Sequence, residues 1–198
     1  MKPDEAAASI QSTIKAAAAC GRRCRIVGGG SKPWLAHASA AGSTEAEVLA
    51  TKALSGIVEY EPTELVIVVR GGTPVAEVEQ AMAEAGQMLA FEPPTADGRA
   101  TIGGTLASAA SGPRRAYAGA VRDFVLGVEL IDGKGDRLRF GGKVMKNVAG
   151  FDISRLVCGS AGTLGVITEV AFKCLPLPKA TETRVYELDM TAAIRAMN

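Results

Sequence analysis

Residues 26–35 read IVGGGSKPWL, so three consecutive glycines follow a short apolar pair and precede Ser31 and Lys32. Because glycine has no Cβ, it adopts positive φ angles readily and lets other groups approach the backbone closely. Successive backbone N–H groups in such a loop can converge on an anion. By itself the stretch predicts either a tight structural turn or a cradle for a phosphate group, and both interpretations stay open at this point.

Two common phosphate-binding motifs do not fit the chain. The dinucleotide fingerprint G-x-G-x-x-G finds its first two glycines at Gly28 and Gly30, but Pro33 stands where the third belongs. The P-loop pattern G-x-x-x-x-G-K-[ST] would need a glycine in place of Arg137 and a hydroxyl residue in place of Val144. Both patterns therefore fail, and another kind of nucleotide site must be considered.

Two later segments are also rich in small residues. Residues 101–112 read TIGGTLASAASG, without a helical amphipathic pattern to explain the composition. Residues 158–168 read CGSAGTLGVIT and place three glycines at intervals of three, directly before an expected strand. Three such segments in one domain favour a single large cofactor that is contacted in several places over a fold that merely depends on glycine.

Composition and charge narrow the function classes. The 198 residues are 47% hydrophobic, with 22 basic against 21 acidic side chains and 5% aromatic residues. This balance gives no reason to expect nucleic acid or an anionic membrane surface as a partner. No apolar run approaches the roughly 18 residues of a membrane span. The four cysteines lack further ligands at short spacing, so we expect buried or idle thiols and no metal site (Cys20, Cys24, Cys158 and Cys174).

The first half of the chain predicts alternating helices and strands. Asp4 is expected to cap a helix that ends near Gly21, and residues 24–29 form a short strand. Residues 44–56 fit a helix or a strand equally well. Further predicted elements are strands over 56–60 and 65–72, the second of them interior, and a helix over 74–86. Thr73 is expected to cap this helix, with Pro74 in its first turn and Val75, Val78, Met82 and Ala85 inward.

The second half predicts an irregular but packed functional segment over 91–123, followed by mixed structure. A hairpin joins strands 124–131 and 136–140 across an Asp-Gly-Lys-Gly turn. The remaining expected elements are a short helix over 149–159, a half-buried strand over 165–177, a strand over 183–190 and the start of a helix from 191.

Three segments taken in order resemble a known family. They are GGGSK at 28–32, PPTADGRATIGGTLASAASG at 93–112, and KNVAGFDISRLVCGSAGTLGVITEV at 146–170. Together they resemble the FAD-binding domain of the vanillyl-alcohol-oxidase/p-cresol-methylhydroxylase (PCMH) flavoproteins over nearly all of residues 20–178. Within that family the third segment is most similar to the FAD-binding E subunits of bacterial glycolate oxidases.

The resemblance implies an α+β fold, namely a PCMH-type FAD-binding domain of two subdomains over residues 1–178. Residues 179–198 would then begin a following domain that is incomplete here. It also implies cofactor-binding residues: Gly28, Gly29, Gly30, Ser31 and Lys32 at the pyrophosphate, Thr101, Ile102, Gly103, Gly104 and Ser108 along the flavin and diphosphate, and Gly165, Val166 and Ile167 near the adenine. Lys146, Asn147, Gly150 and Asp152 match a recurrent family stretch whose role here stays open.

Some family members attach the flavin covalently through a histidine or cysteine in these loops. Neither GGGSK nor PPTADGRATIGG contains such a residue, and the one histidine, His37, lies beyond the glycine loop. A structural role for His37 is favoured over covalent attachment. We therefore expect FAD to be bound without a covalent bond.

The resemblance further implies a FAD-binding subunit of a glycolate oxidase or dehydrogenase complex, which oxidises glycolate to glyoxylate by hydride transfer to the flavin. Its partners would be a second flavoprotein subunit and an iron–sulfur subunit, and it would be cytoplasmic or held at the inner membrane through these partners. No residue is nominated as the general base. Two alternatives stay open: a non-catalytic assembly subunit, and a dehydrogenase of another 2-hydroxy acid such as D-lactate.

Overall fold

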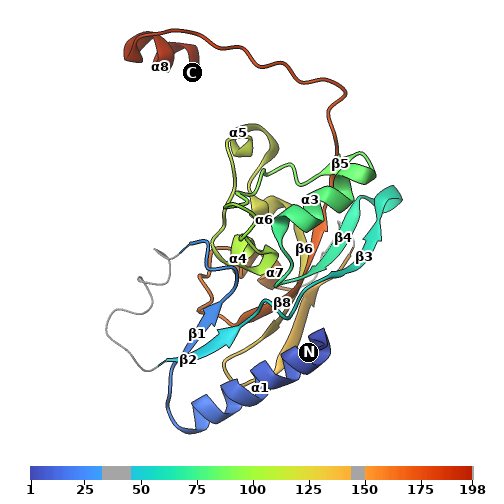
Figure 1. The fold of residues 1–198 in the computed structure, drawn as a ribbon, viewed down its shortest axis with the longest axis vertical. Helices are drawn as coiled ribbons and strands as arrows, with labels where there is room; N and C mark the ends of the chain where they lie inside the picture. Colours follow the sequence, from blue (N-terminus) through green and yellow to red (C-terminus); the bar gives the residue numbers. More distant parts are fainter. Residues whose placement is uncertain (33–45, 144–149, 198) are drawn as a thin grey trace.

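A computed structural model describes residues 1–32, 46–143 and 150–197 of the chain. Its centre is a five-stranded antiparallel sheet in the order β3-β4-β8-β6-β7 (Figure 1). The strands are β3 (Ile57–Glu61), β4 (Val66–Arg70), β6 (Val125–Ile131), β7 (Arg137–Gly141) and β8 (Val166–Lys173). The 3₁₀ helix η1 (Pro62–Glu64) joins β3 to β4, and β5 (Gln87–Met88) pairs with β9 (Leu175–Pro176) in a separate two-stranded sheet.

One face of this sheet is covered by helices and holds the main core (Figure 1). These helices are α3 (Val75–Glu84), α4 (Ile102–Ala107), α6 (Val121–Phe124) and α7 (Ile153–Leu156), with α5 (Arg115–Ala118) in the connection between α4 and α6. Phe91 packs at the centre, with its ring centroid 5.5 Å from that of Phe124 and 5.7 Å from that of Phe172. The main core therefore joins residues 91–123, predicted as irregular but containing α4, α5 and most of α6, to the sheet.

A second core lies between the sheet and the N-terminal unit. That unit consists of α1 (Pro3–Ala19) and the parallel pair β1 (Cys24–Val27) and β2 (Glu47–Ala50). Helix α1 buries Ala6, Ile10 and Ile14, which recur every four residues and so share one face. They pack with residues from β2 and from the ends of β6 and β8 (Leu49, Ile131 and Val166).

Most predicted elements of the first half are confirmed. The ambiguous stretch 44–56 contains a strand, β2, within its described part. Two capping predictions are wrong: Lys2 precedes α1, with Asp4 in the first turn, and Pro74 is the N-cap of α3. The Thr73 hydroxyl instead bonds Gly56, at 2.9 Å from its amide and 3.2 Å from its carbonyl oxygen.

Four other predictions from the sequence are corrected by the structure. Residues 102–107 are helical, because Ile102 and Leu106 lie one turn apart and both enter the main core. Ala85 is exposed at the end of α3. Strand β8 is buried on both faces, since it is the central strand and the N-terminal unit covers one end. Residues 183–189 pair with no strand among the described residues.

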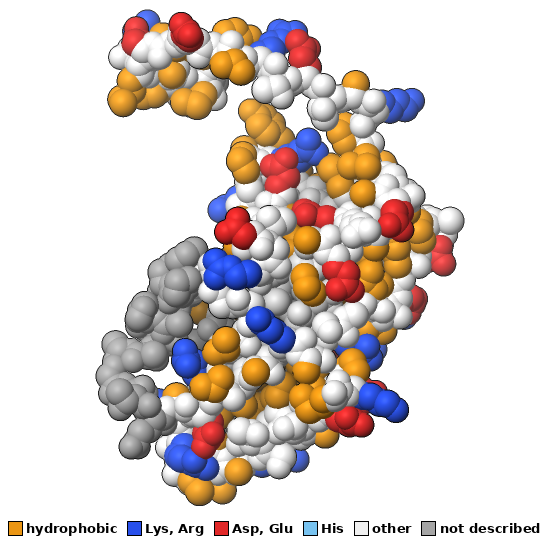
Figure 2. Space-filling model, viewed as in Figure 1, with side chains coloured by type: hydrophobic (Ala, Val, Ile, Leu, Met, Phe, Trp, Pro, Cys, Tyr) orange, Lys and Arg blue, Asp and Glu red, His pale blue; other side chains and the backbone are white. Residues whose placement is uncertain are grey.

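The C-terminal segment leads away from the sheet and ends in α8 (Met190–Met197), which confirms the predicted helix start (Figure 1). Figure 2 shows hydrophobic side chains along this segment, and no residue of α8 is buried. The exposed apolar residues include Val185, Tyr186, Met190 and Ile194. Among the described helices, none is long and apolar enough to cross a membrane.

Candidate functional site

The three glycine-rich segments, which are far apart in the sequence, meet around α4. Residues 28–29 lie against residues 99–101 at the start of α4. At its end, Leu106 and Ala107 accept hydrogen bonds from the amides of Gly159 (3.0 Å) and Ala161 (2.8 Å). A Cβ on Gly162 would lie 3.1 Å from Ile26 of β1. The segments therefore form one continuous region of backbone beside the end of β1.

Within the glycine triplet, the residues serve different purposes. A Cβ on Gly29 would lie 1.5 Å from the carbonyl oxygen of Arg99, and a Cβ on Gly28 would lie 2.7 Å from the hydroxyl oxygen of Thr101. Gly30 faces open space but has a φ of +66°, which side chains disfavour. Gly28 and Gly29 are thus required by the packing of the chain itself, and Gly30 by its backbone conformation.

The loop after β1 offers hydrogen-bond donors. Among the described residues, the backbone amides of Gly28, Gly29, Gly30 and Ser31 have no acceptor. Lys32 follows them, and partial burial lowers the pKa of its ammonium group. Four adjacent amides beside a cation are an arrangement suited to an anion.

The start of α4 differs from the loop after β1, because its first backbone amides already donate hydrogen bonds within the protein. Ile102 N donates to Thr73 O (2.9 Å) and Gly103 N to Gly71 O (2.7 Å). Gly104 N is 3.3 Å from the hydroxyl of Thr101, which caps the helix. Any contact of Thr101–Gly104 with a ligand would therefore come from shape and from atoms other than these amides.

The remaining residues expected at the site contribute backbone more than side chains. Ile102, Val166 and Ile167 are buried in the two cores. The Ser108 hydroxyl lies 2.7 Å from Gly104 O and bonds within its own helix. Gly165 is needed because a Cβ there would lie 2.6 Å from Ile131 O.

Two residues of the recurrent family stretch can be placed. Asp152 caps α7 by accepting a 3.0 Å hydrogen bond from Arg155 N. Its carboxylate also forms an ion pair with the guanidinium group of Arg155. Gly150 has a φ of +81° with open space around it. The expectations for Lys146, Asn147 and His37 concern residues outside the described parts.

One structural centre was missed in the sequence. Gly71–Thr73 connects the segment after β2 with β8 and α4: Gly72 N donates to Leu54 O (2.6 Å), and Gly71 N to Thr168 O (2.8 Å). The signal was the Gly-Gly-Thr-Pro sequence after a buried strand, since consecutive glycines there indicate close backbone contacts.

The cysteines and acidic residues form no metal centre in the described residues, where no three metal-binding side chains come together. Cys20 and Cys24 are exposed, Cys158 is half-buried and Cys174 is buried. Burial raises the pKa of Cys174 to about 12 and also raises that of Cys158. Both thiols are therefore protonated and unreactive at neutral pH.

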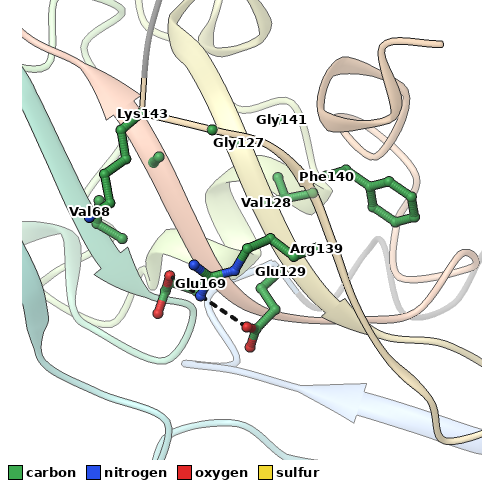
Figure 3. A pocket seen from close by; sticks show the side chains of 11 residues that line it. Val68, Gly127, Val128, Glu129, Arg139, Phe140, Gly141, Lys143 and Glu169 are labelled. Atoms are coloured by element: carbon green, nitrogen blue, oxygen red, sulfur yellow. Dashed lines mark hydrogen bonds and ion pairs between the residues drawn. The ribbon is translucent and has the colours of Figure 1, made fainter. Parts of the chain in front are cut away.

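A shallow hollow on the opposite face of the sheet is occupied by ion pairs (Figure 3). Arg139 lies 3.1 Å from Glu129 and 3.0 Å from Glu169, and Glu129 also bonds Arg137 and Thr168. Burial would raise the pKa of Glu129, but the hydrogen bonds from Arg137 and Thr168 and the nearby positive charge outweigh it, so the pKa is lowered. These charges satisfy one another and support the sheet.

Comparison with known proteins identifies the family. Residues 5–141 match the family described as the FAD binding domain. Over 139 residues the chain is 54% identical to glycolate oxidase subunit GlcE of Escherichia coli (strain K12), covering 70% of this chain and 40% of that protein. It is 36% identical to glycolate oxidase subunit GlcD of Bacillus subtilis (strain 168), covering 69% of this chain and 29% of that protein.

More distant matches agree on the fold. The chain is 31% identical to a D-lactate dehydrogenase of Anaerostipes hadrus, over 64% of this chain and 26% of that protein. A solved structure of alkyldihydroxyacetonephosphate synthase superposes with a TM-score of 0.70 at 22% identity, over 86% of this chain and 30% of the other. The predicted α+β fold of the PCMH type is thus confirmed, and the chain belongs to the FAD-binding domain family, with FAD as its cofactor.

Proposed function

We propose that this chain is the FAD-binding part of an oxidoreductase that acts on a 2-hydroxy acid, and that Gly28–Lys32 hold the FAD pyrophosphate. The observation that carries the proposal is the row of four amides in the loop after β1, for which the described residues offer no acceptor. The names of the relatives, two glycolate oxidase subunits and a D-lactate dehydrogenase, support the substrate class.

The residues present fit a pyrophosphate. Its oxygens accept hydrogen bonds only, and the loop has amides to donate, a lysine nearby and no Cβ on its three glycines. The α4 start and Gly165–Ile167 supply a wall of close-packed backbone, consistent with the flavin and adenine contacts that we propose for Thr101–Ser108 and for Gly165–Ile167. Their contribution is to fix the position of the backbone beside the loop.

We propose non-covalent attachment. The described part of the proposed site contains no histidine, and Cys158 carries a protonated, half-buried thiol. If this is correct, acid precipitation of purified protein releases all the flavin into the supernatant. Flavin absorbance that stays with the pellet would contradict it.

The chemistry that bound FAD supplies is acceptance of a hydride from the carbon that bears the hydroxyl group. We propose that the residues of this chain bind and orient the cofactor; among those described, no three histidine, cysteine or carboxylate side chains come together to hold a metal ion. Glycolate is the favoured substrate because the 54% identical relative is a glycolate oxidase subunit. D-lactate is the competing substrate.

The chain covers 40% or less of each curated relative named above, so we also propose its setting. Residues 1–178 form the FAD-binding domain, with the two cores marking its two subdomains, and residues 179–198 begin a following domain. We propose a second flavoprotein subunit and an iron–sulfur subunit as partners. The assembly would be cytoplasmic or attached to the inner membrane through them.

The test is an anaerobic absorption spectrum of the complete protein, alone and with its partner subunits. Bleaching of the flavin bands by glycolate supports oxidation at this FAD, and a faster response to D-lactate would reassign the substrate. If the bands of this subunit stay oxidised in the complete complex while glycolate is consumed, the chain is an assembly subunit and the catalytic proposal is wrong.

A further inference from the structure

Arg99 lies directly beside the glycine loop. Its carbonyl oxygen occupies the place where a Cβ of Gly29 would be, and its own Cα is 3.5 Å from that place. The side chain of Arg99 is exposed, and among the described residues no acidic side chain forms an ion pair with it. Within the described parts of the chain, the exposed Arg99 side chain thus has no acidic partner, and its backbone packs directly against Gly29 of the loop.

An unusual turn holds Arg99 in this position. Ala96, Asp97 and Gly98 have φ angles of +49°, +55° and +76°, so three consecutive residues adopt the left-handed conformation. Side-chain-bearing residues in this region carry a conformational cost, and the surrounding structure must impose it. Here the amides of Arg99 and Ala100 close the turn on Ala96 O (3.1 Å) and Thr95 O (3.0 Å).

The charge in the loop itself is small for its proposed ligand. A pyrophosphate diester carries two negative charges, whereas the loop contributes one cation, Lys32, whose charged form is disfavoured by partial burial. A guanidinium has several N–H donors in a planar fork and keeps its charge at all accessible pH values. Arginine is thus the side chain best suited to complete an anion site made of amides.

We propose that Arg99 binds the pyrophosphate of FAD held on Gly28–Lys32, and that the left-handed turn at Ala96–Gly98 positions it for this contact. The inference rests on the proposed pyrophosphate loop. It adds a residue that ordinary motif comparison passes over, because Arg99 precedes the Thr-Ile-Gly-Gly sequence and its position becomes apparent only through the contact with Gly29.

The experiment measures dissociation constants of the complete apoprotein for FAD, ADP and riboflavin. Arg99→Gln keeps much of the side-chain length without the charge, and Arg99→Lys keeps the charge without the fork. Arg23→Ala is the matched control, since it removes an exposed arginine just before the other end of β1. Thermal unfolding of each apoprotein shows that the fold is retained.

We expect Arg99→Gln to weaken FAD and ADP binding by about 10- to 100-fold, as for loss of a charge-assisted hydrogen bond. Arg99→Lys should lose less, and Arg23→Ala should match the wild type. Riboflavin, which has no phosphate, should bind the wild type and Arg99→Gln equally. Equal loss for riboflavin, or FAD and ADP binding by Arg99→Gln within twofold of the wild type, would overturn the role of Arg99 alone. A wild-type protein that binds neither FAD nor ADP would overturn the proposed function as well.

Discussion

The amide of Gly103 donates a 2.7 Å hydrogen bond to the carbonyl oxygen of Gly71, and the two backbones meet without room for a side chain. A Cβ on Gly103 would lie 2.9 Å from that oxygen, and a Cβ on Gly71 would lie 2.2 Å from Ile167 O. This contact fixes the start of α4 against β4 and β8. It therefore determines where the wall of the proposed cofactor site stands.

The first prediction concerns this contact. Gly71→Ala should lower the free energy of unfolding by about 3 kcal/mol, because backbone atoms must move to relieve the overlap. Urea unfolding measures the change. Gly133→Ala is the control, since Gly133 has no atom within 4 Å of the added methyl group, and its stability should stay within about 0.5 kcal/mol. A Gly71→Ala protein as stable as the control would show that Gly71 is not tightly packed against Ile167 and Gly103.

The second prediction concerns acid stability. Because the folded pKa of Glu129 is lowered, its carboxylate stabilises the fold above its unfolded pKa, and this stabilisation is lost as the pH falls through the folded pKa. Glu129→Gln should cost about 1–3 kcal/mol at pH 7, since hydrogen bonds to a charged group are lost. Urea unfolding from pH 7 down to pH 3 should show the difference from the wild type shrinking. Glu84→Gln, at an exposed position, should cost little, and a constant deficit for Glu129→Gln at all pH values would contradict this explanation.

The third prediction compares two buried threonines. The Thr105 hydroxyl has no hydrogen-bond partner among the described residues, whereas the Thr168 hydroxyl donates to Glu129 at 2.9 Å. Thr105→Val should therefore raise the free energy of unfolding of the apoprotein by about 1 kcal/mol, and Thr168→Val should lower it by about 1–3 kcal/mol. Thermal or urea unfolding distinguishes the two signs. Destabilisation by Thr105→Val would mean that its hydroxyl has a partner in solution.

Much of the fold could be predicted from local patterns. The N-terminal helix, predicted to end near Gly21, and the hairpin across the Asp-Gly-Lys-Gly turn depend on neighbours in the sequence, and both are confirmed. The errors arise where distant residues decide. Strand β8 is buried on both faces because it is the central strand and packs into three separate clusters, and Thr73 bonds Gly56 rather than capping α3.

The site shows the same division. The composition of the three glycine-rich segments indicated that they belong together, and the structure brings them to one region around α4. The sequence could not show which backbone amides are free to bind a ligand. The amides of Ile102 and Gly103 donate to the carbonyl oxygens of Thr73 and Gly71, which lie some 30 residues earlier in the chain. The position of Arg99 depends on its contact with Gly29, which is 70 residues away in the sequence, and had no local signal.

The fourth prediction separates cofactor binding from stability in the loop. Gly29→Ala is a poor test of the pyrophosphate cradle, because its Cβ would collide with Arg99 O and disturb the fold itself. Lys32→Met is a better one. It keeps an unbranched side chain and removes a charge that burial already disfavours, so the apoprotein should be as stable as the wild type or more stable.

Although its stability should not fall, Lys32→Met should bind FAD about tenfold more weakly, because a cation beside the pyrophosphate is lost. Fluorescence titration of the apoprotein with FAD measures this, and the loss should be smaller at high salt, where charge interactions are screened. Lys134→Met, in the exposed turn between β6 and β7, is the matched control and should change neither quantity. If Lys32→Met binds FAD as tightly as this control at low salt, then Lys32 does not contact the pyrophosphate, and the site depends on the amides and on Arg99.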